Sequence, residues 1–354
     1  MNLDDFSNFP TIDSLNYLAE IDGLPGQLET AWALGQAQPL PAWSGIQRIL
    51  VAGMGGSAIG ADLLAAYLAP SCPAPLIVQR NYTLPAWAGG PQTLVIASSH
   101  SGNTEETLSA FDQAQANGCR ILAVCTGGAL AQKARQSAAA LWTFAHAGQP
   151  RAAVGYSFGL LLAALARLGL TPDPAAEVAG AIAAMRSLQP HIQAQTPVCS
   201  NLAKRLAGQL VGRTVTILGS DILEPVARRW KGQVSELAKC WAQAEALPEA
   251  DHNTLAGLQQ PEQSLLKTSA LFLRAPACHP RNLLRSDLTR RIFMLEGLST
   301  DRFNAPGDTP LAQQWTALLF GDYMAYYLAL AYDIDPTPIQ ALVQFKEALR
   351  ATAP

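Results

Sequence analysis

The chain has 354 residues, of which 49% are hydrophobic and 14% are charged, and its formal net charge is −3. This length is sufficient for two domains, and this composition implies extensive buried surface. A mildly negative chain without a dense run of lysine or arginine is not expected to bind nucleic acid.

The N-terminal segment carries Asp4, Asp5 and Asp13 in place of the basic and apolar regions of a secretory signal. No apolar run reaches the length of a transmembrane helix, since the longest, at 160–165, is followed by Arg167. We therefore expect a cytoplasmic protein without membrane attachment. The six cysteines lack zinc-site spacing and are interpreted as buried free thiols. They are Cys72, Cys119, Cys125, Cys199, Cys240 and Cys278.

Residues 1–45 are predicted to be an N-terminal helical extension, with helical patterns at 12–21 and 24–34. Residues 46–150 then alternate between strand and helix patterns. The predicted strands are 46–52, 74–78, 93–97 and 121–125, and the predicted helices are 57–68, 104–117 and 129–138. Such alternation predicts βαβ units and a doubly wound parallel sheet with helices on both faces.

Residues 151–200 are predicted to form a helical connector, and residues 201–354 a second α/β domain that ends in a C-terminal helix. The connector contains helical patterns at 157–168 and 175–188. In the second domain we predict strands at 214–220, 270–273 and 291–295, and helices from 223 to about 244, at 315–332 and at 339–349. The predicted fold class is thus α/β, with two αβα sandwich domains and no clear sequence repeat between them.

Two loops of small residues lie where predicted strands lead into helices. They are Gly53-Met54-Gly55-Gly56-Ser57-Ala58-Ile59-Gly60 and Ser98-Ser99-His100-Ser101-Gly102-Asn103-Thr104. Glycine allows the backbone to approach a ligand, the following helix offers unpaired N–H groups, and hydroxyls add donors. The pair of loops predicts a binding site for the phosphate group of a small molecule.

Two other interpretations of these loops remain open. Gly55 and Gly60 loosely fit a dinucleotide-binding loop, but the acidic residue expected about 20 residues later is missing from residues 76–80. The loops could also be tight turns in which Ser57 and Thr104 cap helices without any ligand. The hydroxyl-rich second loop favours a compact monophosphate.

The motifs at 53–60 and 99–107 resemble the sugar-isomerase (SIS) domain of the bifunctional phosphoglucose/phosphomannose isomerase family. The similarity continues through nearly the whole chain from residue 45 onward. It includes the segments 149–151, 228–231, 235–239, 251–253 and 321–323, and the terminal helix with Lys346.

The resemblance implies two SIS domains in a homodimer whose active sites lie between domains and between subunits. It also implies interconversion of glucose 6-phosphate, and of mannose 6-phosphate, with fructose 6-phosphate through a cis-enediolate, without a metal or other cofactor. By motif position, the sugar phosphate is expected to bind at two backbone positions and four hydroxyls. These are Gly55, Gly56, Ser57, Ser99, Ser101 and Thr104.

The catalytic roles that the resemblance implies fall on Glu236, Arg151, His252 and Lys346. Glu236 would be the base that moves a proton between C1 and C2, and Arg151 would stabilise the negative charge of the enediolate. His252, from the partner subunit, and Lys346 would open the sugar ring. Without the resemblance, each of these four would be interpreted as a solvated surface residue.

The motif around His252 departs from the family pattern, because Thr254 stands where an acidic residue is usual. Thr337, in the turn before the last helix, is a further candidate for the pocket, and His100 is interpreted as filling the second loop. The alternative function is a non-catalytic SIS-type sensor of sugar phosphates. Such a sensor would keep the phosphate loops and could lose Glu236, His252 or Lys346, whereas this chain has all three.

Overall fold

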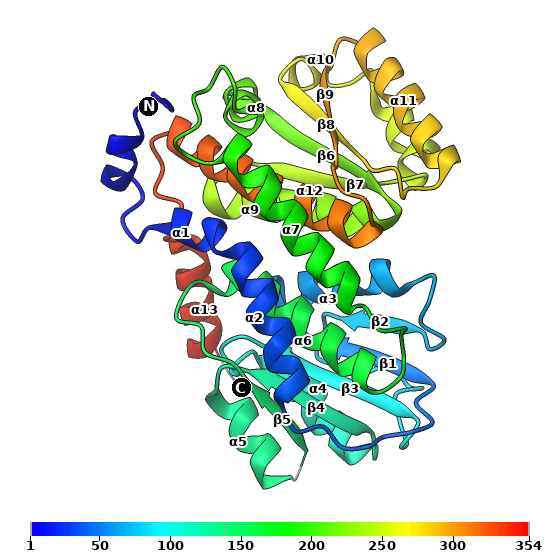
Figure 1. Cartoon of the computed structure of the whole chain (residues 1–354). Coiled ribbons are helices and arrows are strands. Elements are labelled where there is room, and N and C mark those ends of the chain that lie inside the picture. Colours follow the sequence, from blue (N-terminus) through cyan, green and yellow to red (C-terminus); the bar gives the residue numbers. More distant parts are fainter. Residues whose placement is uncertain (1, 138, 353–354) are drawn as a thin grey trace.

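The computed structural model describes residues 2–137 and 139–352, which form two parallel β-sheets (Figure 1). The first sheet has the strand order β2-β1-β3-β4-β5 and the second has the order β7-β6-β8-β9. The first contains β1 (Arg48–Ala52), β2 (Leu76–Gln79), β3 (Thr93–Ser99), β4 (Arg120–Cys125) and β5 (Ala140–Thr143). The second contains β6 (Thr214–Ser220), β7 (Ala242–Leu247), β8 (Thr268–Arg274) and β9 (Ser299–Asn304). The predicted fold class is confirmed.

Helices cover both faces of the first sheet. Alternate side chains of its strands point to opposite faces, so each face presents apolar residues that need cover. Ile49 and Val51 of β1 belong to the large core, whereas Leu50 and Ala52 pack in a second cluster with Phe111. The helices of this part of the chain are α3 (Gly55–Leu68), α4 (Glu105–Ala116), α5 (Gly128–Gln136), the 3-10 turn η2 (Pro150–Ala152) and α6 (Val154–Arg167).

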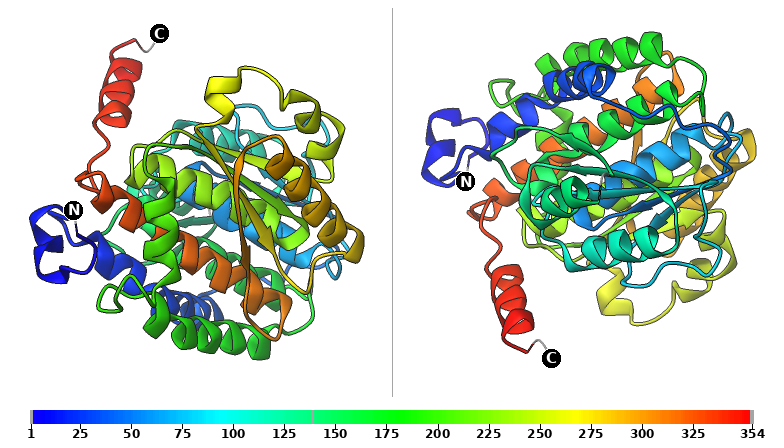
Figure 2. Two further views of the ribbon diagram at one scale, coloured as in Figure 1. Left: turned by 90° about the horizontal axis from the view of Figure 1, so that it is seen from above. Right: turned by 90° about the horizontal axis from the view of Figure 1, so that it is seen from below.

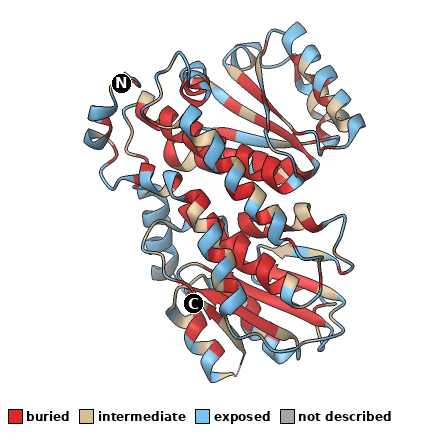
Figure 3. Cartoon of the chain, in the orientation of Figure 1, coloured by how far each residue is buried: buried red, intermediate tan, exposed pale blue. Residues whose placement is uncertain are grey.

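The second sheet packs against α12 (Pro310–Ala331), a helix whose residues 311–330 are all buried (Figure 3). A helix that is buried on every side needs neighbours on every side, and α12 packs mainly against three other helices. These are α7 (Ala175–Ile192), α8 (Leu202–Leu210) and α9 (Glu224–Leu237). The remaining helices here are η3 (Asp221–Leu223), η4 (Glu249–His252), η5 (Thr254–Gly257), α10 (Glu262–Leu265) and α11 (Pro280–Leu295).

The N-terminal extension is part of the main core. It forms η1 (Phe6–Thr11), α1 (Tyr17–Asp22) and α2 (Leu24–Ala37), and α2 packs along α6. The Asp13 carboxylate accepts hydrogen bonds from the backbone N–H groups of Tyr17 (2.7 Å) and Leu18 (3.0 Å), and from the Tyr326 hydroxyl (3.0 Å). Because Asp13 caps α1 and also binds α12, it orients α1 against the second sheet's helices. The domain boundaries at 45, 150 and 200 remain predictions.

The C-terminal helix α13 (Gln340–Ala351) extends away from the rest of the chain (Figure 2). Its residues 341–349 are all exposed. They include four large apolar side chains, Leu342, Val343, Phe345 and Leu349. The apolar side chains of this helix therefore lack intramolecular cover among the described residues.

Several predicted elements are wrong. The helix expected up to about residue 244 ends at Leu237, because Lys239 adopts a left-handed φ of 52° and the following Ala-rich segment pairs with β6 as β7. The strand predicted at 291–295 lies inside α11, since a short apolar run does not distinguish the two structures. Cys199, expected to be buried, is exposed.

No helix among the described residues combines the length and the apolar character that crossing a membrane demands.

Gly321 of α12 tests the close packing between α9 and α12. A Cβ atom there would overlap the indole ring of Trp230, which is fully buried and donates its Nε1–H to the Ala317 carbonyl at 2.8 Å. We expect Gly321→Ala to lower the free energy of unfolding by about 1–3 kcal/mol, because the core has no room for a methyl group. Urea denaturation measures the change.

Gly232, inside α9, is the matched control because a Cβ there meets nothing within 4 Å. Gly232→Ala should stabilise the protein by about 0.5–1 kcal/mol through helix propensity. Equal effects of the two substitutions would contradict this account of the packing.

Candidate active site

The two glycine- and serine-rich loops lie side by side at the carboxyl edge of the first sheet. The first joins β1 to α3 and the second joins β3 to α4, and β1 and β3 are neighbours in the sheet. The strand order changes direction between these two strands, which is where open α/β sheets bind ligands. The His100 backbone N–H donates to the Ser57 hydroxyl at 3.2 Å, so the loops are in direct contact.

The second loop is held in shape by its own hydroxyls. Ser99 Oγ and Thr104 Oγ1 are 2.8 Å apart, and the Gly102 N–H donates to Ser99 Oγ at 3.1 Å. The Asn103 N–H donates to the Ser101 hydroxyl at 3.2 Å. These bonds bring the four predicted hydroxyls to one edge of the sheet, beside the N-termini of α3 and α4, where backbone dipoles favour an anion.

Two glycines of the first loop have distinct roles. Gly55 begins α3 with a φ of 50°, a conformation that favours glycine, and a Cβ there would point into open space. A Cβ on Gly56 would instead collide with the Pro150 carbonyl oxygen and come within 3.2 Å of Arg151 Cα. The absence of a side chain at Gly56 thus lets the phosphate loop lie directly against the segment that carries Arg151.

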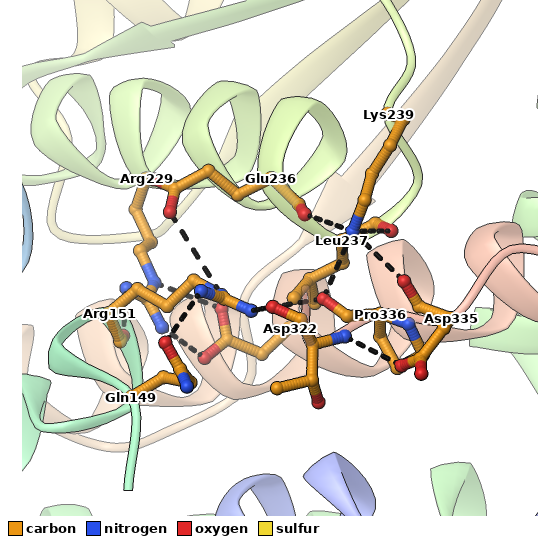
Figure 4. A network of polar contacts seen from close by, with 10 residues as sticks. Gln149, Arg151, Arg229, Glu236, Leu237, Lys239, Asp322, Asp335 and Pro336 are labelled. Carbon is orange, nitrogen blue, oxygen red and sulfur yellow. Dashed lines mark hydrogen bonds and ion pairs between the residues drawn. The ribbon is translucent and has the colours of Figure 1, made fainter. Parts of the chain in front are cut away.

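Arg151 is buried in this position, with 6% of its surface exposed (Figure 4). Its Nη2 donates to the carbonyl oxygens of Pro336 (3.0 Å) and Thr337 (2.7 Å). Its Nε lies 3.9 Å from Glu236 Oε2 and has no hydrogen-bond partner among the described residues. The Thr337 hydroxyl is also buried without a partner there. Unpaired buried groups of this kind are unusual and often mark the place of a ligand.

Glu236 lies in the last turn of α9, and 34% of its side chain is exposed. The helix is anchored by Arg229, which forms a two-pronged ion pair with Asp322 of α12 through bonds of 3.0 and 2.7 Å. Arg229 also donates to the Arg151 backbone carbonyl at 2.7 Å. One buried guanidinium therefore fixes the helix of Glu236 to the segment of Arg151.

The sequence analysis missed Tyr17 of the N-terminal extension. The guanidinium of Arg151 lies over the Tyr17 ring, 5.0 Å from its centre. Burial raises the pKa of Tyr17 to about 12, against the opposing influence of Arg229 and Arg151, so the ring remains neutral beneath the cation. No local pattern in the sequence could have indicated this contact, because about 130 residues separate the two positions.

His252 and Lys346 are not brought to this site within one chain. His252 ends η4 and is exposed, and Lys346 is exposed on α13. Neither side chain forms a hydrogen bond or ion pair with the described residues. Across the described ranges, no group of three His, Cys, Asp or Glu side chains is arranged to hold a metal ion.

His100 was expected only to fill the second loop, but its side chain also forms a contact outside that loop. Its Nε2 lies 2.9 Å from His146 Nδ1, and His146 Nε2 lies 3.1 Å from the Glu20 carboxylate. Burial, followed by the neighbouring His146, lowers the pKa of His100 to about 4. His100 is therefore neutral near pH 7, and it joins the second phosphate loop to α1.

The chain forms two α/β units with parallel sheets, and hydroxyl-rich loops lie at the switch point of the first sheet. These features define an SIS-type protein. A model of the bacterial phospho-glucose isomerase C-terminal SIS domain matches residues 199–349. The fold is also similar to that of a glucose-6-phosphate isomerase like protein from Thermus thermophilus, with a TM-score of 0.65, 19% identity and coverage of 97% of this chain and 99% of that one.

Relatives define the family more narrowly. The chain is 36% identical over 328 residues to the bifunctional phosphoglucose/phosphomannose isomerase of Caldicellulosiruptor bescii, covering 92% of this chain and 96% of the relative. It is 29% identical over 309 residues to the enzyme of the same name from Aquifex aeolicus, covering 86% and 91%. The chain belongs to the bifunctional phosphoglucose/phosphomannose isomerase family.

The lowered pKa of His100 predicts a specific loss of stability in acid. A group with a folded-state pKa near 4 and an ordinary value of 6.5 stabilises the fold above about pH 6.5, and this contribution disappears as the pH falls to about 4. We expect urea denaturation at pH 7 and pH 5 to show a smaller decrease in stability for His100→Asn than for the wild type.

The control is His191→Asn, at an exposed position near the end of α7. This variant should retain the wild-type pH dependence. An unchanged pH dependence in His100→Asn would show that His100 is not held neutral by its surroundings.

Proposed function

We propose that this protein interconverts glucose 6-phosphate and mannose 6-phosphate with fructose 6-phosphate through a cis-enediolate. The observation that carries the proposal is the approach of Glu236 to within 3.9 Å of Arg151, on a segment that packs directly against the phosphate loop. A base, a fixed cation and an anion site thus lie along one path between the two sheets. The names of the two relatives identify the same pair of aldose substrates.

The phosphate group would bind at the edge of the first sheet. Ser57, Ser99, Ser101 and Thr104 supply hydroxyl donors there, and the open backbone at Gly55 lets the ligand approach the start of α3. Binding at this end holds the sugar without touching the carbons that react. Its binding energy would therefore orient C1 and C2 toward Glu236.

Glu236 would remove the proton from C2 of the open-chain aldose and return it to C1. The ketose results when the hydroxyl proton also passes from O2 to O1. The partial exposure of Glu236 leaves the carboxylate accessible to a ligand, while the rigid α9 fixes its position. The enediolate carries negative charge on oxygen, and the buried guanidinium of Arg151 would stabilise that charge without reorganisation. The unpaired Nε of Arg151 and the Thr337 hydroxyl are available to bind substrate oxygens.

Ring opening would require the second subunit of a homodimer. His252 and Lys346 would perform this step. Both side chains are exposed and do not lie at the site of Glu236 and Arg151 in the single chain, so within one chain they would not reach the substrate. The uncovered apolar face of α13 supports an association that buries this helix. We further place the enzyme in the cytoplasm, in keeping with its six free cysteines.

The alternative of a non-catalytic sugar-phosphate sensor is less well supported. A sensor would need only the phosphate loops, whereas here Glu236 and Arg151 are placed together by a buried network that includes Arg229 and Asp322. The relatives from Caldicellulosiruptor bescii and Aquifex aeolicus are also isomerases by name.

Removing the base tests the proposed reaction. We expect Glu236→Gln to lower kcat for both aldose phosphates by about 10²- to 10⁴-fold with little change in KM, because the amide cannot accept the proton. A coupled assay of fructose 6-phosphate formation measures both constants. Glu296→Gln, at an exposed position after α11, is the control and should leave them unchanged.

Absence of turnover in the wild type would refute the isomerase function. Undiminished turnover in Glu236→Gln would refute only the role of this residue.

Mixing two inactive variants tests the shared active site. In a dimer that combines Glu236→Gln with His252→Asn, one site has lost both residues and the other retains both, so activity should return when the subunits are exchanged. Each variant alone should remain inactive. We expect the mixture to approach about one quarter of wild-type activity, from statistical pairing of subunits in a symmetric dimer. Failure to recover activity in a verified mixed dimer would place His252 and Glu236 in the same subunit's site.

A further inference from the structure

Lys239 lies just beyond the end of α9 and folds back over it (Figure 4). Its left-handed backbone, with a φ of 52°, turns the chain so that the side chain returns to the helix. The Nζ atom donates to the carbonyl oxygens of Glu236 (2.8 Å) and Leu237 (3.2 Å). Lys239 thus caps the end of the helix that carries Glu236.

The same ammonium group also binds the segment Asp335–Thr337, which we call the strap. Its Nζ donates to the carbonyl oxygens of Asp335 (3.0 Å) and Pro336 (3.2 Å). One side chain therefore connects the last turn of α9 to a segment almost a hundred residues later in the chain.

The strap is bound to Arg151 from its other side. Arg151 Nη2 donates to the carbonyl oxygens of Pro336 and Thr337, so Pro336 accepts bonds from both cations. The strap is further held by the Ser14 hydroxyl, which donates to the Asp335 carboxylate at 2.5 Å. The Asp335 carboxylate also accepts the Thr337 N–H at 2.9 Å.

We propose that Lys239 is a positioning residue that sets the separation between Glu236 and Arg151 by clamping the end of α9 to the strap. The proposal rests on the isomerase function proposed above. At 3.9 Å, the contact between Glu236 and Arg151 is too long for a hydrogen bond and does not by itself define their geometry. The Pro336 carbonyl accepts hydrogen bonds from both Lys239 and Arg151, and therefore links the end of α9 to the Arg151 side chain.

Such positioning matters because proton transfer depends on the placement of the base to within a fraction of an ångström. If the clamp is lost, the last turn of α9 can fray, and Glu236 is in that turn. The second phosphate loop is held in shape on the first sheet by its own hydrogen bonds, so the loops would bind substrate as before. The loss should therefore affect kcat more than KM.

The charge of Lys239 is sensitive to its neighbours. The charged groups that face it are Arg151 from η2, Glu236 from α9 and Asp335 from the strap. Burial, followed by the repulsion of Arg151, lowers the pKa of Lys239 to about 8 despite the two carboxylates. The neutral amine has fewer protons to donate than the ammonium, so the four carbonyl contacts should weaken as the pH rises through this range.

The experiment compares Lys239→Met, Lys239→Arg and Lys267→Met with the wild type. Lys267 is an exposed lysine before β8 and serves as the matched control. For Lys239→Met we expect kcat for fructose 6-phosphate formation to fall about tenfold or more, with the KM for the aldose phosphate within about threefold of the wild type. Lys239→Arg should recover kcat to within about threefold, and its alkaline decline in kcat should begin at least about one pH unit higher, because arginine keeps its charge.

Hydrogen exchange of the same proteins measures the clamp independently of activity. Peptides that cover the end of α9 and the strap should exchange faster in Lys239→Met than in the wild type or in Lys267→Met. In the wild type they should also show extra opening above about pH 8, beyond the intrinsic rise in exchange, which Lys239→Arg should lack. These comparisons remain valid if Lys239→Met folds poorly, since Lys239→Arg and the wild type suffice.

The inference is wrong if Lys239→Met keeps kcat within about twofold of the wild type, or if Lys239→Arg keeps the wild-type alkaline decline. It is also wrong if exchange at α9 and the strap is unaffected. Inactivity of the wild type would instead refute the isomerase function, and in that case the exchange data would still decide whether Lys239 forms the clamp.

Discussion

The buried guanidinium of Arg229 is the interaction on which the site depends. It projects from α9, pairs with Asp322 of α12 through two bonds, and donates a third to the backbone of Arg151. A buried charge is costly unless all its partners are in place, so this group tolerates only one arrangement of the three segments. Arg229 thereby fixes α9, which carries Glu236, to α12 and to the segment that carries Arg151.

In the proposed reaction, residues carried by both sheets contact one ligand. The first sheet contributes the two glycine- and serine-rich loops at its switch point, and the second contributes α9 with Glu236. Gly56 removes the side chain that would separate the phosphate loop from Arg151. The N-terminal extension adds the ring of Tyr17 against the Arg151 guanidinium, and the strap adds carbonyl oxygens that accept hydrogen bonds from the same group. Substrate binding and proton transfer are thus assigned to different domains that share one buried arginine.

The accuracy of the sequence analysis varied with the range of the interactions. The strand–loop–helix units at 48–68 and 93–116 were predictable because apolar strands, glycines and hydroxyls follow each other locally. The strand β7 was not, because its Ala-rich sequence favours a helix and only pairing with β6 makes it a strand. The segment 291–295 was predicted as a strand because a short apolar run fits either structure, whereas it forms the end of α11.

By itself, the sequence determined the α/β class, the position of the two glycine- and serine-rich loops and, through resemblance, the family and its candidate residues, because each of these depends on short, contiguous motifs. Only the tertiary structure decided what surrounds Glu236 and Arg151. Tyr17, Asp322 and the strap come from three segments far from Glu236 in the sequence. Their contacts, like the bonds from Lys239 to the strap, follow from chain crossings that no local pattern encodes. The structure also left His252 and Lys346 exposed, which is the physical reason to seek their role across a subunit interface.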